Sequence, residues 1–209
     1  MINVRSYQLW AFVGGFAITV LMFVVARACS NFPGDEWILK ASQRIEVDWL
    51  DALALGLDEM GEVPVLPALL GGSILALFAA RRRVESLMIV ASLPFMVAGQ
   101  LLKLAVGRAR PEEMLAFAES AGFGFPSGHS VYAMLFGGLM IFIAGRLIRN
   151  VWVRRFVQGF VVLWIVATGA SRVYLGVHWP SDVVGGFMFG AISLTLIIAG
   201  RNTSNSGRW

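Results

Sequence analysis

Three ionisable side chains lie within twelve residues of an otherwise apolar chain, in the stretch SRVYLGVHWPSD from Ser171 to Asp182. They are the guanidinium of Arg172, the imidazole of His178 and the carboxylate of Asp182. A carboxylate beside an imidazole holds it in one tautomer, ready to attack an electrophile or to move a proton. A nearby arginine suits an anionic substrate. The stretch therefore predicts histidine chemistry on an anion, and the alternative interpretation is a polar loop between two helices.

The composition of the 209-residue chain is that of a membrane protein. Hydrophobic residues make up 57% of it, the mean hydropathy is +0.73, and charged residues make up 14%. Ordinary soluble domains have ~25% charged residues, and a soluble domain of this size could not bury so much apolar surface. The single cysteine, Cys29, excludes an intrachain disulfide and a cysteine metal cluster.

Six apolar runs are each predicted to cross the membrane as a helix, because ~20 apolar residues span the ~30 Å hydrocarbon core. The first run is longer than the apolar region of a signal sequence, so we expect it to remain as a membrane span. The expected fold is an all-α polytopic membrane protein with six transmembrane helices, in one membrane domain over residues 1–209. The runs cover residues 8–26, 63–80, 86–102, 131–145, 156–170 and 183–200.

The longest polar interval, residues 31–62, carries eight acidic and two basic residues. Apolar residues alternate with charged ones at mostly helical spacing, which predicts one or two amphipathic helices on the membrane surface. A solvated loop with some helix is the equally open alternative. The apolar positions are Ile38, Ile45, Leu50, Leu53 and Leu57.

Charge is distributed unequally between the two sides of the predicted six-span bundle. The side with both termini collects ten of the seventeen basic residues and one acid, Glu85. The other side has seven bases and twelve acids, and both histidines. By the positive-inside rule, both termini are expected in the cytoplasm, with the histidines on the non-cytoplasmic face of a cell membrane.

Three segments resemble, in the family's order, the three signatures of the type 2 phosphatidic acid phosphatase (PAP2) superfamily. The resemblance covers about residues 60–200, including the six-helix plan. The segments are Lys103 to Pro111 (KLAVGRARP), Pro126 to His129 (PSGH), and Ser171-Arg172 followed by His178 and Asp182.

The resemblance implies a membrane-embedded phosphatase that acts on a lipid phosphate or lipid pyrophosphate. In this interpretation, Lys103, Arg110 and Arg172 neutralise the phosphate and the charge of the transition state. Ser127 and Gly128 stand at a helix start, where backbone N–H groups favour an anion. Undecaprenyl pyrophosphate, phosphatidylglycerol phosphate and phosphatidic acid share this headgroup chemistry, so the motifs do not distinguish them.

The resemblance also implies a catalytic role for three residues. His178 would attack phosphorus and form a phosphohistidine, while Asp182 would hold its tautomer and stabilise the imidazolium. His129 would protonate the leaving oxygen and then activate the water that hydrolyses the intermediate.

The remaining polar residues near the first signature are expected to have no catalytic role. Arg108 is predicted to be solvated or to meet lipid headgroups. Glu112, Glu113 and Glu119 lack a histidine in a metal-binding pattern, and the cations supply positive charge, so we expect no metal and no cofactor. The expected partners are the lipid phosphate substrate and membrane lipids, without nucleic acid.

Two other functions are compatible with an anion pocket. Vanadate-dependent haloperoxidases share this pocket in the wider superfamily, but they are soluble, and six predicted spans argue against that activity. A polytopic anion carrier would line a path through the bundle with charge. Here the predicted spans have uncharged centres and the charges gather at one face, which favours a site at that face.

Overall fold

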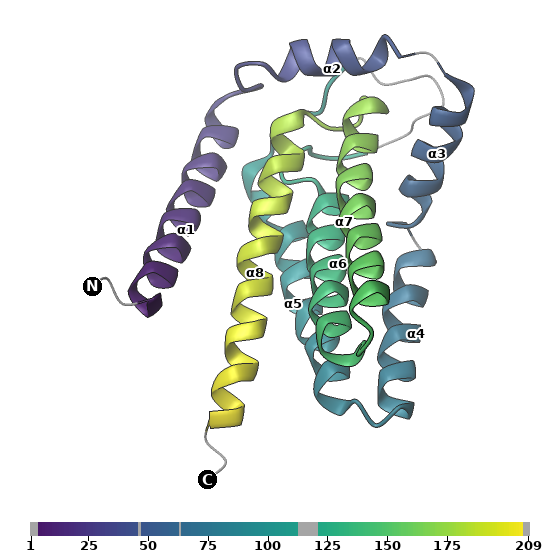
Figure 1. Cartoon of the computed structure of the whole chain (residues 1–209). Coiled ribbons are helices and arrows are strands. Elements are labelled where there is room, and N and C mark those ends of the chain that lie inside the picture. The colour runs from purple at the N-terminus through teal and green to yellow at the C-terminus, as the bar shows by residue number, and fades with distance from the viewer. Residues whose placement is uncertain (1–3, 46, 63, 113–120, 207–209) are drawn as a thin grey trace.

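The computed structural model describes residues 4–45, 47–62, 64–112 and 121–206, and every regular element within these ranges is an α-helix (Figure 1). The helices are α1 (Val4–Ala28), α2 (Asp35–Gln43), α3 (Asp48–Glu59), α4 (Val65–Ala79), α5 (Arg83–Val106), α6 (Gly128–Leu147), α7 (Val151–Tyr174) and α8 (Pro180–Ser206).

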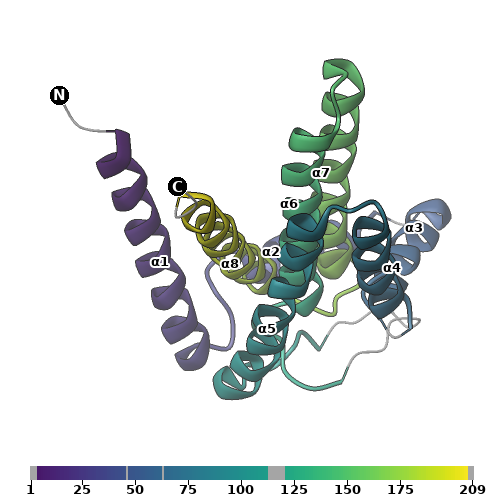
Figure 2. The ribbon, with the colours of Figure 1, turned by 90° about the horizontal axis from the view of Figure 1, so that it is seen from below.

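Helix α6 lies at the centre of the bundle and packs against α5, α7 and α8. It is the most buried of the long apolar helices, which is why its buried residues form most of the main core. Helix α4 packs on the outside of α5. The N-terminal part of α1 stands away from the other helices, and α1 joins the bundle near its other end, where Ala26 packs with Val106 and Phe125 (Figures 1 and 2).

Small residues bring α6 and α8 into close contact. A Cβ added to Gly138 would lie 2.3 Å from the side chain of Leu194, and one added to Gly190 would lie 2.8 Å from Met134. A Cβ on Gly186 would lie 2.7 Å from the carbonyl oxygen of Ser127. Small residues allow such backbone approach between membrane helices. The crossing therefore fixes the start of α6 beside the first turns of α8.

Among the residues that the structure describes, five helices are long and apolar enough to cross a membrane, namely α1, α5, α6, α7 and α8. The predicted span 63–80 is shorter than expected, since α4 has 15 residues. At ~1.5 Å per residue α4 is about 22 Å long, which is less than the ~30 Å core. In Figure 1, α3 stands end to end with α4, on the side of the bundle end that α2 covers.

The polar interval forms two helices, α2 and α3, which is within the number of helices that the amphipathic interpretation predicted. Their buried faces contact protein. Leu39 of α2 packs with Val173 and Trp179, while Ala54 of α3 packs with Leu175 and Val177. Helix α2 lies across one end of the bundle, and α3 descends along α7 (Figure 1).

The three sequence signatures meet at the end of the bundle that α2 covers. Helix α5 ends there, α6 and α8 begin there, and α7 ends there, so residues 103–111, 126–129 and 171–182 come together (Figure 1). The N-terminal end of α1 and the C-terminal end of α8 point toward the opposite end.

Candidate active site

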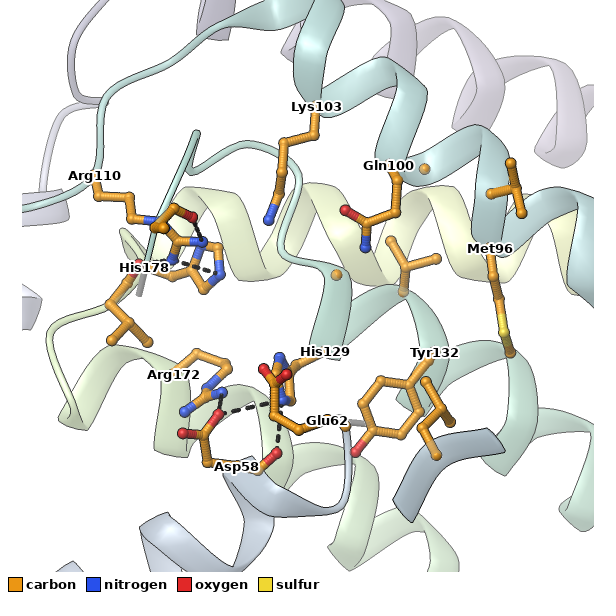
Figure 3. A pocket seen from close by; sticks show the side chains of 18 residues that line it. Asp58, Glu62, Met96, Gln100, Lys103, Arg110, His129, Tyr132, Arg172 and His178 are labelled. Atoms are coloured by element: carbon orange, nitrogen blue, oxygen red, sulfur yellow. Dashed lines mark hydrogen bonds and ion pairs between the residues drawn. The ribbon is translucent and has the colours of Figure 1, made fainter. Parts of the chain in front are cut away.

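A cavity of about 940 Å³ opens where the three signatures meet (Figure 3). Six of the eight predicted site residues line it: Lys103, Arg110, Gly128, His129, Arg172 and His178. The other two, Ser127 and Asp182, have no exposed surface and lie behind the cavity wall. The cavity therefore brings together residues from the three separate segments that carry the signatures.

His178 stands in the loop between α7 and α8, and its two ring nitrogens have different neighbours. Nδ1 is 3.3 Å from Oδ2 of Asp182, and Nε2 is 3.2 Å from Nη1 of Arg110. A carboxylate only accepts and a guanidinium only donates, so the proton belongs on Nδ1 and the lone pair on Nε2. Nε2 therefore faces the cation-lined cavity with its lone pair, as a nucleophile requires.

The charge state of His178 agrees with this tautomer. Its side chain is almost completely buried. Burial, with the positive charges of Arg110, Lys103 and Arg172, lowers the pKa of His178 well below its usual value. The free site therefore holds a neutral imidazole at neutral pH.

Asp182 is held in place by the main chain and by a buried arginine. Its Oδ2 also accepts from the backbone N–H of Trp179 at 3.0 Å, and its carbonyl oxygen accepts from the N–H of Ser127 at 3.0 Å. Its Oδ1 is 2.5 Å from Nη1 of Arg108. With both carboxylate oxygens occupied, Asp182 has one orientation toward His178.

The prediction that Arg108 is solvated or meets lipid headgroups was wrong. Its side chain has no exposed surface, and its Nη2 pairs with Oδ2 of Asp35 at 2.8 Å. Asp35 also accepts from the N–H and the hydroxyl of Ser181 at 2.9 and 2.6 Å. The left-handed Gly107 (φ 67°) ends α5 and turns the chain so that Arg108 enters the bundle.

Arg172 and His129 both contact Asp58, in the last turn of α3. Nη1 of Arg172 forms an ion pair with Oδ1 of Asp58. Nε2 of His129 is 2.9 Å from the carbonyl oxygen of Asp58 and 3.3 Å from its Oδ1 (Figure 3). Sequence reasoning assigned no role to Asp35 or Asp58, and their one signal was that they are acids on the predicted outer side.

The remaining cations and the start of α6 complete the cavity. Arg110 donates to the carbonyl oxygens of Val177 at 2.6 Å and Ala121 at 3.2 Å, which holds two loops together. Ser127 caps α6, since its hydroxyl accepts from the N–H of Ser130 at 3.4 Å. A Cβ on Gly128 would lie 2.8 Å from Nε2 of Gln100, so the absence of a side chain keeps this wall open.

Within the described ranges, one group of acids and histidine is close enough to hold a metal ion. The ligand atoms of Asp58, Glu62 and His129 lie within 4.8 Å of one another. Asp58 is already paired with Arg172, whose positive charge opposes a cation there. Of the three glutamates considered from the sequence, Glu112 is exposed, and Glu113 and Glu119 lie outside the described residues.

The opposite wall of the cavity is apolar. It includes Leu66 of α4 and Met96 and Val97 of α5. Val97 is 59% exposed, so this wall continues onto the outer surface of the helices. Met96 lies on the far side of the cavity from Arg110 and His178 (Figure 3). The cavity therefore has a cationic end and an apolar end, which suits a lipid with an anionic headgroup.

Comparison with known proteins agrees with the site. Residues 82–206 match the PAP2 superfamily. The chain is 31% identical to phosphatidylglycerophosphatase B of Bacillus subtilis over 164 residues, which are 78% of this chain and 81% of the relative. It is also 41% identical to a lipid A 4'-phosphatase of Bacteroides thetaiotaomicron over 69 residues, or 33% of this chain and 27% of that protein.

A solved structure shares the fold. The PAP2-type phosphatidylglycerolphosphate phosphatase from Bacillus subtilis superposes with a TM-score of 0.78 at 27% identity, covering 92% of this chain and 98% of that one. The chain therefore belongs to the PAP2 superfamily, and it is a membrane lipid phosphatase similar to phosphatidylglycerophosphatase B.

Proposed function

We propose that the protein removes the terminal phosphate of a glycerophospholipid of the phosphatidylglycerol phosphate type, through a phosphohistidine on His178. The observation that carries this proposal is the convergence of Lys103, Arg110 and Arg172 around a lone pair on His178, in a cavity whose other wall is apolar. The Bacillus subtilis relatives, which are named for phosphatidylglycerol phosphate, support this substrate class. Phosphatidic acid and undecaprenyl pyrophosphate are the alternative substrates.

In the first step, Nε2 of His178 attacks phosphorus and the ester oxygen leaves with the P–O bonding electrons. In the substrate complex the negative charge of the phosphate favours a protonated His129 ring. His129 gives the proton on its Nδ1 to the ester oxygen, which releases the lipid alcohol. Asp182 stabilises the positive imidazole ring that results. The three cations stabilise the negative charge that spreads over the equatorial oxygens of the transition state.

In the second step, His129, now without that proton, accepts one from a water molecule. The water oxygen attacks the phosphorus of the phosphohistidine, and the P–N bond breaks toward Nε2. Inorganic phosphate leaves, and His178 and His129 return to their starting states. The overall change is the addition of one water molecule across the ester bond.

For the membrane arrangement, we propose six crossings, with α4 as the short sixth span, and an active site on the non-cytoplasmic face. Helices α3 and α4 together lead from the end that α2 covers to the opposite end, where α5 begins, which supports a crossing there. Basic residues collect at the end away from the site, and the positive-inside rule puts such an end in the cytoplasm.

The direct test is phosphate release by purified protein from a panel of phosphatidylglycerol phosphate, phosphatidic acid and undecaprenyl pyrophosphate. We expect the highest kcat/KM on phosphatidylglycerol phosphate. Arg110→Gln should abolish most of this activity, while Arg149→Gln, an equal charge loss at the other end, should not. Phosphate release from none of the lipids would overturn the proposal, and a preference for the diphosphate would overturn the substrate class.

A further inference from the structure

Asp58 lies outside the three signatures yet contacts two of their residues. It stands in the last turn of α3, 114 positions before Arg172 in the chain. Its carboxylate forms an ion pair with Arg172, and its carbonyl oxygen lies within hydrogen-bond distance of Nε2 of His129. One residue of a helix before the motifs thus holds a phosphate-binding cation and the acid–base histidine.

The contact with Arg172 leaves a specific part of its guanidinium free. Nη1 is used by Asp58, while Nε and Nη2 are buried and have no hydrogen-bond partner among the described residues. These two nitrogens form one edge of the planar guanidinium, with parallel N–H donors that match two oxygens of a phosphate. Buried donors without partners cost free energy until a ligand satisfies them.

The contact with His129 decides which ring nitrogen can exchange a proton. The near neighbours of Nε2 are two oxygen acceptors of Asp58, the carbonyl at 2.9 Å and Oδ1 at 3.3 Å. Neither oxygen of an ionised aspartate carries a hydrogen, so the hydrogen must be on Nε2. In the neutral ring the lone pair is then on Nδ1, which is left for proton transfer.

We propose that Asp58 is a positioning residue of the phosphatase site. Its carboxylate presents the Nε–Nη2 edge of Arg172 to the substrate phosphate, and its carbonyl sets the His129 tautomer that works through Nδ1. This inference rests on the proposed function for the identity of the phosphate, but its geometry concerns any phosphate-like anion. The competing idea is that Asp58 blocks Arg172 and must be displaced by the substrate.

The two ideas predict opposite changes in anion affinity. With Asp58→Asn, we expect the dissociation constant of vanadate, measured by calorimetry in detergent, to rise about tenfold or more, on the scale of losing a partner that orients a binding residue. Glu59→Gln removes the same charge from the next, exposed residue and should leave affinity within about twofold. Tighter vanadate binding by Asp58→Asn would overturn the proposal in favour of a blocking role.

A double-mutant cycle tests whether the effect passes through Arg172. If it does, Asp58→Asn should add little to the loss caused by Arg172→Lys, because the orientation of the original guanidinium no longer exists. Losses that simply multiply would contradict the proposal. Vanadate binding needs no turnover, so a protein that binds vanadate in this way but hydrolyses no lipid would refute the proposed function and leave the inference standing.

The tautomer is tested separately by ¹⁵N NMR on histidine-labelled protein with His178→Asn, which leaves His129 as the single histidine of the chain. We expect Nε2 to carry the hydrogen and Nδ1 to show the chemical shift of an unprotonated nitrogen near neutral pH. A hydrogen on Nδ1 instead would overturn the assignment to the Asp58 carbonyl.

Discussion

Arg108 and Asp182 form an ion pair in which neither side chain has any exposed surface, with 2.5 Å between Nη1 and Oδ1. Arg108 also forms an ion pair with Asp35, whose carboxylate oxygens accept hydrogen bonds from the N–H and the hydroxyl of Ser181. The carboxylate behind His178 is thus tied to α2, across the end of the bundle. Because these side chains are buried, loss of the Arg108 charge would leave the carboxylates of Asp35 and Asp182 without a cation and would free Asp182 to change its orientation.

The first prediction is that Arg108→Met destabilises the protein and reduces its activity. The substitution leaves two buried carboxylates without their cation, and breaking a buried pair costs about 3–5 kcal/mol. Thermal unfolding in detergent and phosphate release should both report the loss. Arg44→Met, at an exposed position in the same half of the chain, should change stability by less than about 0.5 kcal/mol. Equal behaviour of the two variants would refute the structural role of Arg108.

Arg108 also shows where prediction from the sequence ends. Its neighbours in the chain predict a solvated interfacial cation, because the partners that bury it lie 73 and 74 positions away. The motif residues were easier to place, since helix ends that carry Lys103, His129 and Arg172 must meet if the spans alternate in direction. The spacing of the motifs predicted cationic and histidine residues that line the cavity. It could not predict the contacts of Asp35 and Asp58, because these depend on packing between residues far apart in the chain.

The length of α4 is a second case of the same kind. Hydropathy identified residues 63–80 as apolar and predicted a full span. It could not reveal that Asp58 and Gly61 sit beside His129, where a Cβ on Gly61 would lie 2.3 Å from the imidazole. Because the end of α3 reaches the cavity, α4 begins beside the cavity and, with 15 residues, is shorter than the five long apolar helices of the described chain.

The second prediction concerns metal ions. If Lys103, Arg110 and Arg172 supply the positive charge, phosphate release should persist in EDTA. Vanadate should inhibit, because its trigonal-bipyramidal form resembles the transition state of phosphoryl transfer. Phosphate release measured with chelator, and again after added Mg²⁺, tests this point. Complete loss with EDTA that Mg²⁺ restores would contradict the assignment of these cations.

The third prediction concerns the ionisation of His178. Its pKa is lowered, chiefly by burial and then by Arg110, so the ring should stay neutral when the pH falls below the usual histidine value of about 6.5. In a His129→Asn variant, ¹⁵N NMR reports this single histidine directly. The sign for stability follows: the unfolded state binds a proton below pH ~6.5 and the folded state does not, so stability should fall with acidification in that window.

The same titration of His178 also defines the outcome that would contradict this prediction. A midpoint at or above about 6.5 in the folded variant would show a ring that is charged too readily to act as the neutral nucleophile. As a control, the urea-unfolded variant should titrate near the ordinary value.

The fourth prediction concerns the side of the membrane. In a Cys29→Ser background, Ala121→Cys at the site end should react with an impermeant thiol reagent in intact cells whose wall the reagent can cross. Val151→Cys, an exposed position at the opposite end, should react only after the membrane is permeabilised. Both substitutions leave the charge pattern unchanged. The reverse labelling pattern would place the active site in the cytoplasm.

The fifth prediction separates the two histidines. In the proposed mechanism His178 forms the bond to phosphorus, so His178→Ala should lose activity on every substrate by roughly 10³-fold or more, the scale for removing a nucleophile. In the same mechanism His129 protonates a poor alkoxide leaving group, whereas an activated aryl phosphate needs little protonation when it departs. His129→Ala should therefore slow phosphorylation of the enzyme by a lipid far more than by an aryl phosphate.

The phosphorylated enzyme itself gives the sharpest readout of this division. If His129 also activates the water, as proposed, phosphohistidine should persist on His178 in the His129→Ala variant. Rapid quenching in alkali, where phosphohistidine survives, should trap the label, and the His129→Ala/His178→Ala double variant should carry none. Equal losses on lipid and aryl substrates, with no trapped label, would instead favour direct attack by water, with both histidines moving only protons.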